Sequence, residues 1–418
     1  MEFGKIMTDA LIIDACRTPR GIGKAGKGAL AEIHPQRLGA AVLKALVERN
    51  GIDTADVDDV VWGTNAQRGV HSNDLGRMSA LDAGYDVRSS GVTLDRFCGS
   101  GLSAAAIAAA SIMSGMEDLV VAGGTEMMSI TTRRGTDEGP RLLDNGNLHL
   151  RVLHPQPQQG ICADAIATLE GISREALDDL ALLSQQRAAK AIGAGYFARS
   201  LIPVHHEDGR LALDREEYPR PQTTREGLGG LKPAFEALAD VPLDAAGVTY
   251  RKLIHQKYPD LDIVFAHHAG NSSGVVDGSA ALLLASRGYA KAHGLKPRAR
   301  VVAMANMGDN PTLMLNAPVP AARKVLAKAG LTLDDIDLFE VNEAFAVVVE
   351  RFIRELQLDR AKVNVNGGAI ALGHPIGATG VILIGSMLDE LERRDLKRGL
   401  VTMCAGGGMA PAIIIERV

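Results

Sequence analysis

The feature that most constrains the fold is an order of short segments that occurs twice along the chain. In each copy an apolar strand precedes a glycine-rich turn, a buried helix and a further strand that ends at glycines. Single positions match weakly, but the shared order at an offset of about 280 residues predicts a duplicated unit. The paired segments are 58–63 with 337–342, 99–113 with 377–387, and 119–124 with 400–407.

Short apolar runs alternate with Ala-rich stretches, a pattern typical of a layered α/β fold. Residues 10–14 and 57–63 are predicted as strands, and residues 36–49 as a helix with a period near 3.6. Residues 101–114 predict a second helix that is apolar on nearly every face, which indicates burial inside the protein.

The middle of the chain differs in composition from the two halves. It contains most of the Pro, Arg, Asp and Gln, and an amphipathic stretch over 173–194 predicts a helix within it. We interpret it as an inserted lid or loop domain that carries binding residues. The predicted division is a first half of residues 1–128 plus 262–296, a loop domain of 129–261 and a second half of 297–418.

Charge and cysteine content argue against several functional classes. A formal net charge of −5 gives no reason to expect a nucleic-acid surface. The four cysteines lie far apart without CxxC or Cys/His ligand spacing, which favours reduced thiols in the cytoplasm. The first residues lack the apolar core of a signal peptide, and no run approaches ~18 uninterrupted apolar residues. We therefore expect a cytoplasmic protein that does not span a membrane.

Cys98 stands in Asp-Arg-Phe-Cys-Gly-Ser-Gly, directly before the predicted buried helix. A cysteine at a helix N-terminus faces free N–H groups and the positive end of the dipole, which favour the thiolate. The sequence therefore predicts that the pKa of Cys98 falls from ~8.5 toward 4–7, as for a nucleophile. The alternative is a small buried core cysteine.

Three further residues follow turns or strands in the second half. His374, flanked by glycines and followed by proline, suits a general base, with a helix cap or structural role as the alternative. Cys404 ends the last long strand and is either a core residue or part of a site. Asn342 also lies at a strand end, where it either caps a helix or holds a water or an oxyanion.

Four short blocks now occur in one order: Cys-Gly-Ser-Gly at 98–101, Asn-Glu-Ala-Phe at 342–345, Gly-His-Pro-Ile-Gly at 373–377 and Cys-Ala-Gly-Gly at 404–407. This combination resembles the signature blocks of the thiolase family, and the match covers essentially the whole chain. Supporting similarities are Arg-Thr-Pro at 17–19, Gly-Gly-Thr-Glu-Met-Met-Ser at 123–129, Leu-Lys-Pro-Ala-Phe at 231–235 and Ala-Gly-Asn-Ser-Ser-Gly at 269–274.

The resemblance implies an α/β, thiolase-like fold: two duplicated βαβαβαββ halves that form a five-layer α-β-α-β-α core with an inserted loop domain. It also implies roles for residues. Cys98 is then the acyl-accepting nucleophile, His374 its base and Cys404 the second proton carrier. His374 with a water on Asn342 forms one oxyanion hole, and the N–H groups of Cys98 and Gly406 form the other. The implied coenzyme A contacts are Ser273 to the pantetheine arm, Arg220 to a phosphate or the adenine end, and Gly160 in the loop domain.

The implied activity is CoA-dependent cleavage of a 3-ketoacyl-CoA to acyl-CoA and acetyl-CoA through acyl-Cys98, or the reverse Claisen condensation, as in fatty-acid β-oxidation. Coenzyme A is a substrate, and no metal or permanently bound cofactor is implied. The family also implies a homodimer or homotetramer. One alternative is an acetoacetyl-CoA-specific biosynthetic acetyl-CoA acetyltransferase. A different class is a non-catalytic acyl-CoA-binding scaffold, which is disfavoured because Cys98, His374 and Cys404 are all present.

The sequence departs from the family at three places near the acyl and pantetheine pockets. Acetoacetyl-specific members carry His-Met-Gly where this chain has Gln-Gln-Gly at 158–160. The segment 265–268 reads Phe-Ala-His-His where small apolar residues or Thr are usual, and about 20 extra residues lie near 237–260. These differences predict an altered pocket, with neutral variation of a loop as the alternative.

Overall fold

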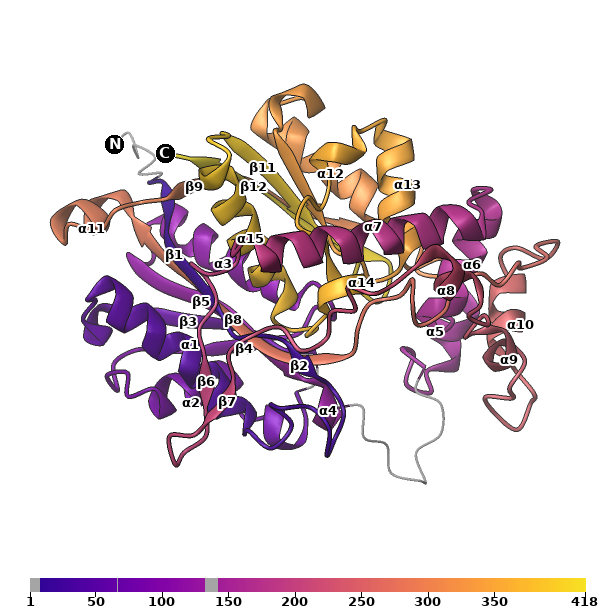
Figure 1. The fold of residues 1–418 in the computed structure, drawn as a ribbon, viewed down its shortest axis with the longest axis horizontal. Coiled ribbons are helices and arrows are strands. Elements are labelled where there is room, and N and C mark those ends of the chain that lie inside the picture. Colours follow the sequence, from indigo (N-terminus) through magenta and orange to yellow (C-terminus); the bar gives the residue numbers. More distant parts are fainter. Residues whose placement is uncertain (1–7, 66, 132–141) are drawn as a thin grey trace.

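The computed structural model describes residues 8–65, 67–131 and 142–418. Its main sheet consists of two sets of strands with the same internal order (Figure 1). The first set runs β4-β3-β5-β8-β1, and the short β2 (Gly21–Ile22) pairs with β8. Its strands are β1 (Ala10–Arg17), β3 (Asp59–Gly63), β4 (Val92–Leu94), β5 (Leu119–Met127) and β8 (Val276–Ser286).

The second set repeats this arrangement in the order β10-β11-β12-β9. Directions match as well: β3 and β5 are parallel, as are β10 and β11, while the remaining pairs within each set of long strands are antiparallel. A parallel bridge from Phe339 to Val363 takes the place of β4. The strands are β9 (Ala299–Gly308), β10 (Leu338–Val341), β11 (Arg398–Thr402) and β12 (Met409–Arg417).

The two sets join into one ten-stranded sheet, which the sequence did not predict. The joint is short, because only Leu11 with Arg300 and Ile12 with Ala299 pair between β1 and β9. β1 and β9 are each the first long strand of their half. The two halves therefore meet through equivalent strands, as expected for two copies related by an approximate twofold axis.

Six helices complete a five-layer core. α3 (Ser100–Ser114) and α15 (Thr379–Arg393) pack together in the centre and share one hydrophobic cluster with both sets of strands (Figure 1). α1 (Pro35–Asn50) and α2 (Leu75–Asp82) cover the outer face of the first set. α12 (Pro318–Ala329) and α13 (Ala346–Leu356) cover that of the second. The predicted layers and the burial of the 101–114 helix are confirmed.

The stretch Phe97–Ser114, which includes α3, meets the length and apolarity of a membrane span, and 56% of it is buried inside the protein. Its Leu102, Ala104, Ala105, Ala108 and Ile112 lie in the central cluster. Packing between the two sets of strands accounts for the apolar composition, since most of the helix is buried.

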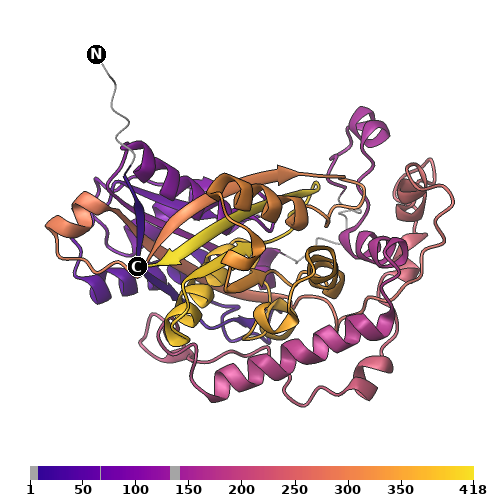
Figure 2. The ribbon, with the colours of Figure 1, turned by 90° about the horizontal axis from the view of Figure 1, so that it is seen from above.

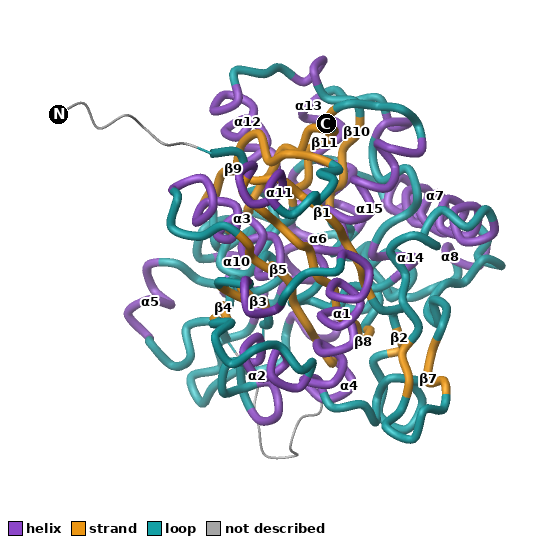
Figure 3. Tube along the Cα trace, turned by 90° about the vertical axis from the view of Figure 1, so that its left-hand side faces the viewer, coloured by secondary structure: helices purple, strands orange, loops and turns teal. Residues whose placement is uncertain are grey.

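The middle segment is mostly helix and loop. Its longest element, α7 (Arg174–Gly193), matches the predicted 173–194 helix and runs along the lower edge of Figure 2. It packs against α13, α14 (Ala369–Leu372) and α8 (Arg225–Gly229), and Figure 3 shows α7, α8 and α14 grouped on one side. The remaining elements are α4 (Met128–Thr131), α5 (Leu148–Leu153), α6 (Gln159–Leu169), β6 (Val204–His205), β7 (Leu211–Leu213), α9 (Glu236–Ala239), α10 (Tyr250–His255) and α11 (Arg287–Ala292).

Candidate active site

Cys98 lies in a tight turn between β4 and α3. Phe97, directly before it, has a left-handed backbone with φ of +50°, a conformation that bulky L-residues rarely adopt. Asp95 Oδ1 accepts the Phe97 N–H at 2.7 Å. Ser100 Oγ accepts the Arg96 N–H at 2.8 Å and donates to the Phe97 carbonyl at 2.6 Å. These bonds hold Cys98 on a rigid corner.

The prediction that the helix N-terminus lowers the pKa of Cys98 is wrong. α3 begins at Ser100 with Gly99 as its N-cap, so Cys98 lies outside the first turn, where the dipole acts. Although Cys98 is partly exposed, burial raises the pKa of its thiol to about 12, and the Glu126 carboxylate acts in the same direction. The thiol is therefore protonated near neutral pH and needs a base.

His374 has the protonation state of such a base. Thr379 Oγ1 donates to the Pro375 carbonyl at 2.9 Å, so its lone pair accepts the Nδ1–H of His374 at 2.6 Å. This network leaves Nε2 without a proton, 3.4 Å from Asn342 Nδ2. Burial lowers the pKa of His374 to about 4, so the ring is neutral near pH 7. α15 starts at Thr379 with Ala378 as N-cap, which excludes the helix-cap alternative.

Glycines bring the His374 loop of the second half against the first half. The carbonyl oxygen of Gly377 lies where Cβ atoms would stand at three positions of the first half. A Cβ on Gly124 would be 2.1 Å from that oxygen, one on Gly101 2.6 Å and one on Gly63 2.8 Å. A side chain at any of these positions would clash with the Gly377 carbonyl. Glycine at Gly63 of β3, Gly124 of β5 and Gly101 of α3 therefore lets the two halves approach.

Asn342 reaches the same place from β10. Its N–H donates to the Thr402 carbonyl of β11 at 3.1 Å, which continues the parallel pairing of Val341 with Thr402. The Oδ1 atom of Asn342 is buried and has no hydrogen-bond partner among the described residues. α13 begins at Ala346 with Phe345 as N-cap, so Asn342 is not a helix cap. Its free acceptor fits a bound water.

Cys404 and Gly406 follow β11 in a turn beside the Cys98 corner. The nearby Cys98 thiol adds to the effect of burial, and together they raise the pKa of Cys404. A Cβ on Gly406 would stand 2.9 Å from the ring of Phe97. The structure thus brings Cys98, Cys404 and Gly406 together at one turn and His374 beside Asn342, and the contact of Gly377 with Gly101 holds the His374 loop against α3, which starts at that turn.

The three residues proposed for coenzyme A binding lie in different surroundings. Arg220 lines a cavity of about 190 Å³, with its guanidinium 5.4 Å from the ring of Tyr218. The Ser273 N–H donates to the Ala344 carbonyl at 2.9 Å, which sets it beside the Asn-Glu-Ala-Phe block. Gly160 is not among the residues that line this cavity. It packs against Phe235 instead, and a Cβ at this position would stand 2.3 Å from the Phe235 ring. Other lining residues are Gln185, Gln222, Thr223, Thr224, Gly227, Leu228, Leu231, Ala269, Gly270 and Ile370.

Comparison with known families decides what this arrangement belongs to. The family described as "Thiolase, N-terminal domain" matches residues 10–242, and "Thiolase, C-terminal domain" matches residues 295–417. The chain belongs to the thiolase family. The resemblance drawn from the four blocks is confirmed, and so is the thiolase-like α/β fold.

Relatives are similar along nearly their whole length. The steroid 3-ketoacyl-CoA thiolase FadA6 of Mycobacterium tuberculosis is 42% identical, over 99% of this chain and 96% of that protein. A β-ketoadipyl-CoA thiolase of Acinetobacter baylyi is 39% identical, over 99% and 100%. The crystal structure of the Bacillus anthracis acetyl-CoA acetyltransferase has a TM-score of 0.82 at 35% identity and covers 99% of this chain and 100% of its own.

The protein is therefore an enzyme with thiolase activity, an acyltransferase that works on acyl-CoA. The predicted enzyme class is confirmed, and the non-catalytic scaffold is not favoured. The thiolase names of the relatives differ in their acyl groups, so substrate selection depends on this chain's own pocket residues.

The glutamine that lies against the Cys98 and Cys404 region is Gln156, outside the block at 158–160 that the sequence analysis associated with the acyl pocket. Gln158 caps α6, since its side-chain oxygen accepts the N–H groups of Gly160 at 2.6 Å and Ile161 at 3.3 Å. Gln156 instead lies against the catalytic turn, with its Oε1 3.8 Å from the position of a Cβ on Gly407. Gln156 is 9% exposed. Only the tertiary contact distinguishes the two.

The unusual histidines at 267 and 268 support the loop that carries Ser273. His268 Nε2 lies 2.9 Å from Asp178 Oδ1, and its Nδ1 accepts the Gly270 N–H at 3.0 Å. His267 Nδ1 lies 2.7 Å from Asp164 Oδ1, and its ring meets the edge of Phe345 at 5.6 Å. Both side chains are buried. The histidines therefore tie the loop to α6 and α7.

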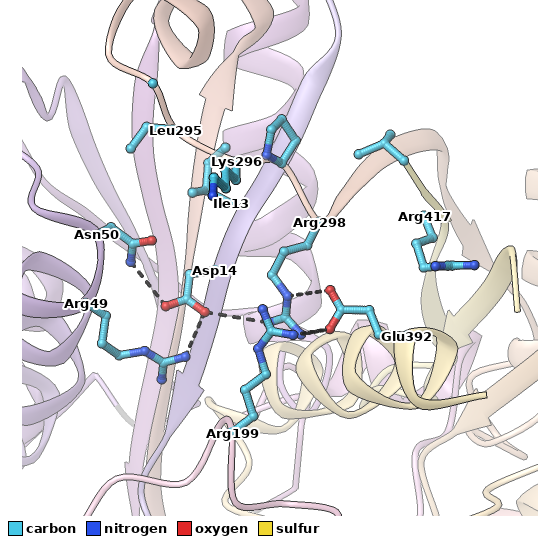
Figure 4. A pocket seen from close by; sticks show the side chains of 13 residues that line it. Ile13, Asp14, Arg49, Asn50, Arg199, Leu295, Lys296, Arg298, Glu392 and Arg417 are labelled. Atoms are coloured by element: carbon cyan, nitrogen blue, oxygen red, sulfur yellow. Dashed lines mark hydrogen bonds and ion pairs between the residues drawn. The ribbon is translucent and has the colours of Figure 1, made fainter. Parts of the chain in front are cut away.

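A larger cavity lies away from this thiolase site. It measures about 530 Å³ and opens at the joint of β1 with β9, between α1 and α15 (Figure 4). Asp14 pairs with Arg49 at 2.9 Å and lies 3.6 Å from Arg298, which binds Glu392 at 2.6 Å. These ion pairs connect α1, both halves of the sheet and α15, so the cavity walls serve the joint between the halves.

Sequence reasoning gave no role to two residues at the site, Gln156 and Glu126. Glu126 is the carboxylate of the Gly-Gly-Thr-Glu block and is fully buried at the end of β5. The signal that could have found it is a charged residue inside an otherwise apolar strand, because buried carboxylates need a specific reason.

Proposed function

We propose that this thiolase cleaves 3-ketoacyl-CoA with coenzyme A to acyl-CoA and acetyl-CoA through an acyl group on Cys98. The observation that carries the proposal is the meeting of four functional groups from both halves at one turn. A protonated thiol, a neutral imidazole with a free Nε2, an amide with an unpaired oxygen and a second thiol supply what the chemistry needs.

In the first half-reaction the Cys98 sulfur attacks the 3-keto carbon while His374 Nε2 takes the thiol proton. The bond between C2 and C3 then breaks, the acyl group stays on sulfur as a thioester, and the C2 carbon receives a proton from Cys404. Acetyl-CoA leaves. The raised pKa of Cys404 suits it to hold a proton until this carbanion forms.

In the second half-reaction the thiol of coenzyme A gives its proton to Cys404 and attacks the acyl-Cys98 carbonyl. The carbon–sulfur bond to Cys98 breaks, acyl-CoA leaves, and the Cys98 sulfur regains its proton from His374. Both proton carriers return to their starting state. In the reverse direction the same steps condense two acyl-CoA molecules.

Two oxyanion sites support these steps. His374 and a water on Asn342 bind the thioester oxygen of the acetyl-CoA part, and the N–H groups of Cys98 and Gly406 bind the oxygen on the acyl carbon. The unpaired Oδ1 of Asn342 supports the water site.

Replacing Asn342 with alanine is expected to lower kcat about 10²–10³-fold, since the water that it holds is a preorganised donor toward the developing negative charge. Steady-state cleavage of acetoacetyl-CoA measures this. Asn366, buried with its amide on Glu390 at 2.9 Å, provides the matched control, and Asn366→Ala is expected to retain kcat within about tenfold. Equal losses in both variants would contradict a specific role of Asn342.

The inserted segment 129–261 acts as the lid that binds coenzyme A, between a first half of 1–128 plus 262–296 and a second half of 297–418. Tyr218, Arg220 and Thr223 of this segment line the cavity that Ala269 and Gly270 close from the Ser273 loop. Arg220 meets a phosphate or the adenine end, and Ser273 meets the pantetheine arm. Gly160 acts indirectly, by making room for Phe235.

Gln156 makes the acyl pocket favour a chain with a hydrogen-bonding terminus. 3-Oxoadipyl-CoA and 3-oxohexanoyl-CoA have the same length and differ in a carboxylate against a methyl group. Gln156→Leu is expected to shift the ratio of their kcat/KM values about ten- to a hundredfold toward the methyl compound, because a lost hydrogen bond to a charged group is worth about 1.5–3 kcal/mol. Gln158→Leu, which alters only a helix cap, is the control. A strong preference of the unmodified enzyme for acetoacetyl-CoA would contradict the proposal.

We further propose a homodimer or homotetramer located in the cytoplasm. The edge strand β4 leaves Val92 43% exposed, and Ile107 of α3 is 47% exposed, which leaves apolar surface for a second copy. The described cysteines are all free thiols, which suits a reducing compartment. Light scattering of the purified protein measures the oligomeric state, and a monomer would contradict it.

Alkylation with iodoacetamide tests the covalent step directly. Cys98 is expected to be alkylated first, because the other cysteines are buried, and prior incubation with acetyl-CoA is expected to protect it. Peptide mass mapping then locates the acetyl group on Cys98. Absence of any acyl adduct would overturn the proposed function.

A further inference from the structure

Glu126 lies where the two halves meet behind Cys98. It stands at the end of β5, paired across to Gly278 of β8, and its side chain is fully buried. Its Oε2 atom accepts the Asn65 N–H at 2.8 Å and the Gly377 N–H at 3.0 Å. One carboxylate oxygen thus joins the end of β3 to the loop that carries His374.

The other oxygen of Glu126 is in a different situation. Oε1 is buried without a well-aligned hydrogen bond among the described residues, and the neighbouring Thr64 hydroxyl acts on this carboxylate and lowers its pKa. A buried carboxylate oxygen without a well-aligned hydrogen bond destabilises the folded protein. The two amide contacts alone therefore do not explain why a glutamate is buried at residue 126. The Glu126 charge also acts on Cys98, where it disfavours the thiolate.

We propose that Glu126 is a positioning residue that ties the His374 loop to the first half through its hydrogen bonds to Asn65 and Gly377, and whose negative charge controls the reactivity of Cys98. The proposal rests on the role of Cys98 as nucleophile and adds a control on it. A resting thiol in place of a thiolate protects the enzyme from alkylation and oxidation between turnovers.

Other ionisable groups near Glu126 are few. Burial raises the pKa of Glu126 to about 7, and Asp95 on the Cys98 turn acts in the same direction, whereas the two amide contacts and the Thr64 hydroxyl lower it. Asp277 directly precedes Gly278 on β8. Cys98 lies in the turn before α3, and its thiol interacts with the Glu126 charge. His374 lies three residues before Gly377 and is neutral near pH 7. Glu126 therefore gains its charge within the working pH range.

Two variants separate its two effects. In Glu126→Gln a side-chain oxygen still accepts both amide N–H groups, but the charge is gone. The rate of Cys98 alkylation at pH 8 is expected to rise about tenfold, because the loss of a nearby like charge lowers the thiol pKa by about one unit. In Glu126→Ala the tie is lost, and kcat/KM is expected to fall about 10²-fold through misplacement of His374. Glu126→Gln is expected to restore most of that loss.

Asp277→Asn is the matched control. Asp277 is also a fully buried carboxylate, its Oδ1 accepts the Ser129 N–H at 2.8 Å, and it does not act on Cys98. Its replacement is expected to leave the pH profile of Cys98 alkylation unchanged.

The measurement is the alkylation rate of Cys98 from pH 6 to 10, followed by peptide mass mapping, with the melting temperature recorded for each variant. A native-like Glu126→Gln with an unchanged alkylation profile overturns the proposal, as does Glu126→Ala with unchanged kcat/KM. If Glu126→Ala does not fold, Glu126→Gln still decides. Failure of acetyl-CoA to acylate Cys98 would overturn the proposed function instead, and the alkylation profile would still report the charge effect.

Discussion

Replacing Cys98 with serine is expected to lower kcat for 3-ketoacyl-CoA cleavage by about 10⁴-fold or more, in line with the loss of other covalent nucleophiles. A serine hydroxyl is a far weaker acid than a thiol, and His374, whose pKa burial lowers to about 4, is too weak a base to deprotonate it. A serine ester would also release its acyl group less readily to coenzyme A. Single-turnover cleavage of acetoacetyl-CoA and mass spectrometry of the enzyme measure both defects.

Cys16→Ser is the matched control for this experiment. Cys16 is buried in β1, and its Sγ donates to the Val42 carbonyl at 3.3 Å, far in sequence from the catalytic blocks. Its replacement is expected to leave kcat within about tenfold. A Cys98→Ser enzyme with nearly full activity would refute the acyl-Cys98 intermediate, and an acyl group found on Cys404 would reassign the nucleophile.

Replacing Glu216 with alanine is expected to cost about 3–5 kcal/mol of the free energy of unfolding, as for other broken buried ion pairs. Glu216 holds the guanidiniums of Arg17 and Arg20, each at 2.7 Å, and these three side chains are 2%, 3% and 6% exposed. Truncation leaves two buried cations without their counter-charge. Equilibrium urea unfolding measures the loss.

Glu207→Ala provides the control, because the Glu207 side chain is 86% exposed and 4.0 Å from Arg37. It is expected to change stability by less than about 0.5 kcal/mol. Equal stabilities of the two variants would show that the Glu216 cluster does not stabilise the fold.

The contribution of Glu216 to stability depends on pH. Burial acts to raise its pKa, but the charges of Arg17 and Arg20 outweigh burial and lower the pKa to about 2. A depressed folded-state pKa stabilises the native state above the unfolded value near ~4.5, and this gain is lost as the pH falls from ~4.5 to 2. The stability difference between the unmodified protein and Glu216→Gln is therefore expected to be largest near pH 7 and to shrink toward pH 2. A difference independent of pH would contradict this account.

Much of the fold follows from local patterns in the sequence. The apolar faces of residues 101–114 predict the buried α3, and the repeated order of segments predicts two equivalent halves. Both features depend on periodicity and composition within short windows, which local side-chain chemistry determines. The predicted ends of the long helices are accurate to a few residues at most positions, but α15 continues to Arg393, beyond the predicted end at residue 387.

The sequence alone also indicated which residues come together, through the four blocks that contain Cys98, Asn342, His374 and Cys404. The tertiary structure decided their chemical state. The pKa of Cys98 is raised because the protein around it excludes water and because the charge of Glu126, on the neighbouring strand β5, acts on it. No short-range pattern contains that information.

Which of two neighbouring glutamines faces the site was likewise a tertiary matter. Gln158 turns back to cap its own helix, while Gln156 meets Gly407 from the other half of the chain. The pairing of β1 with β9 and the contact of Gly377 with three glycines of the first half also depend on tertiary packing. Sequence therefore determined the family, the layers and the candidate catalytic side chains, whereas packing between the halves determined protonation, approach and pocket lining, since burial and charge act through space.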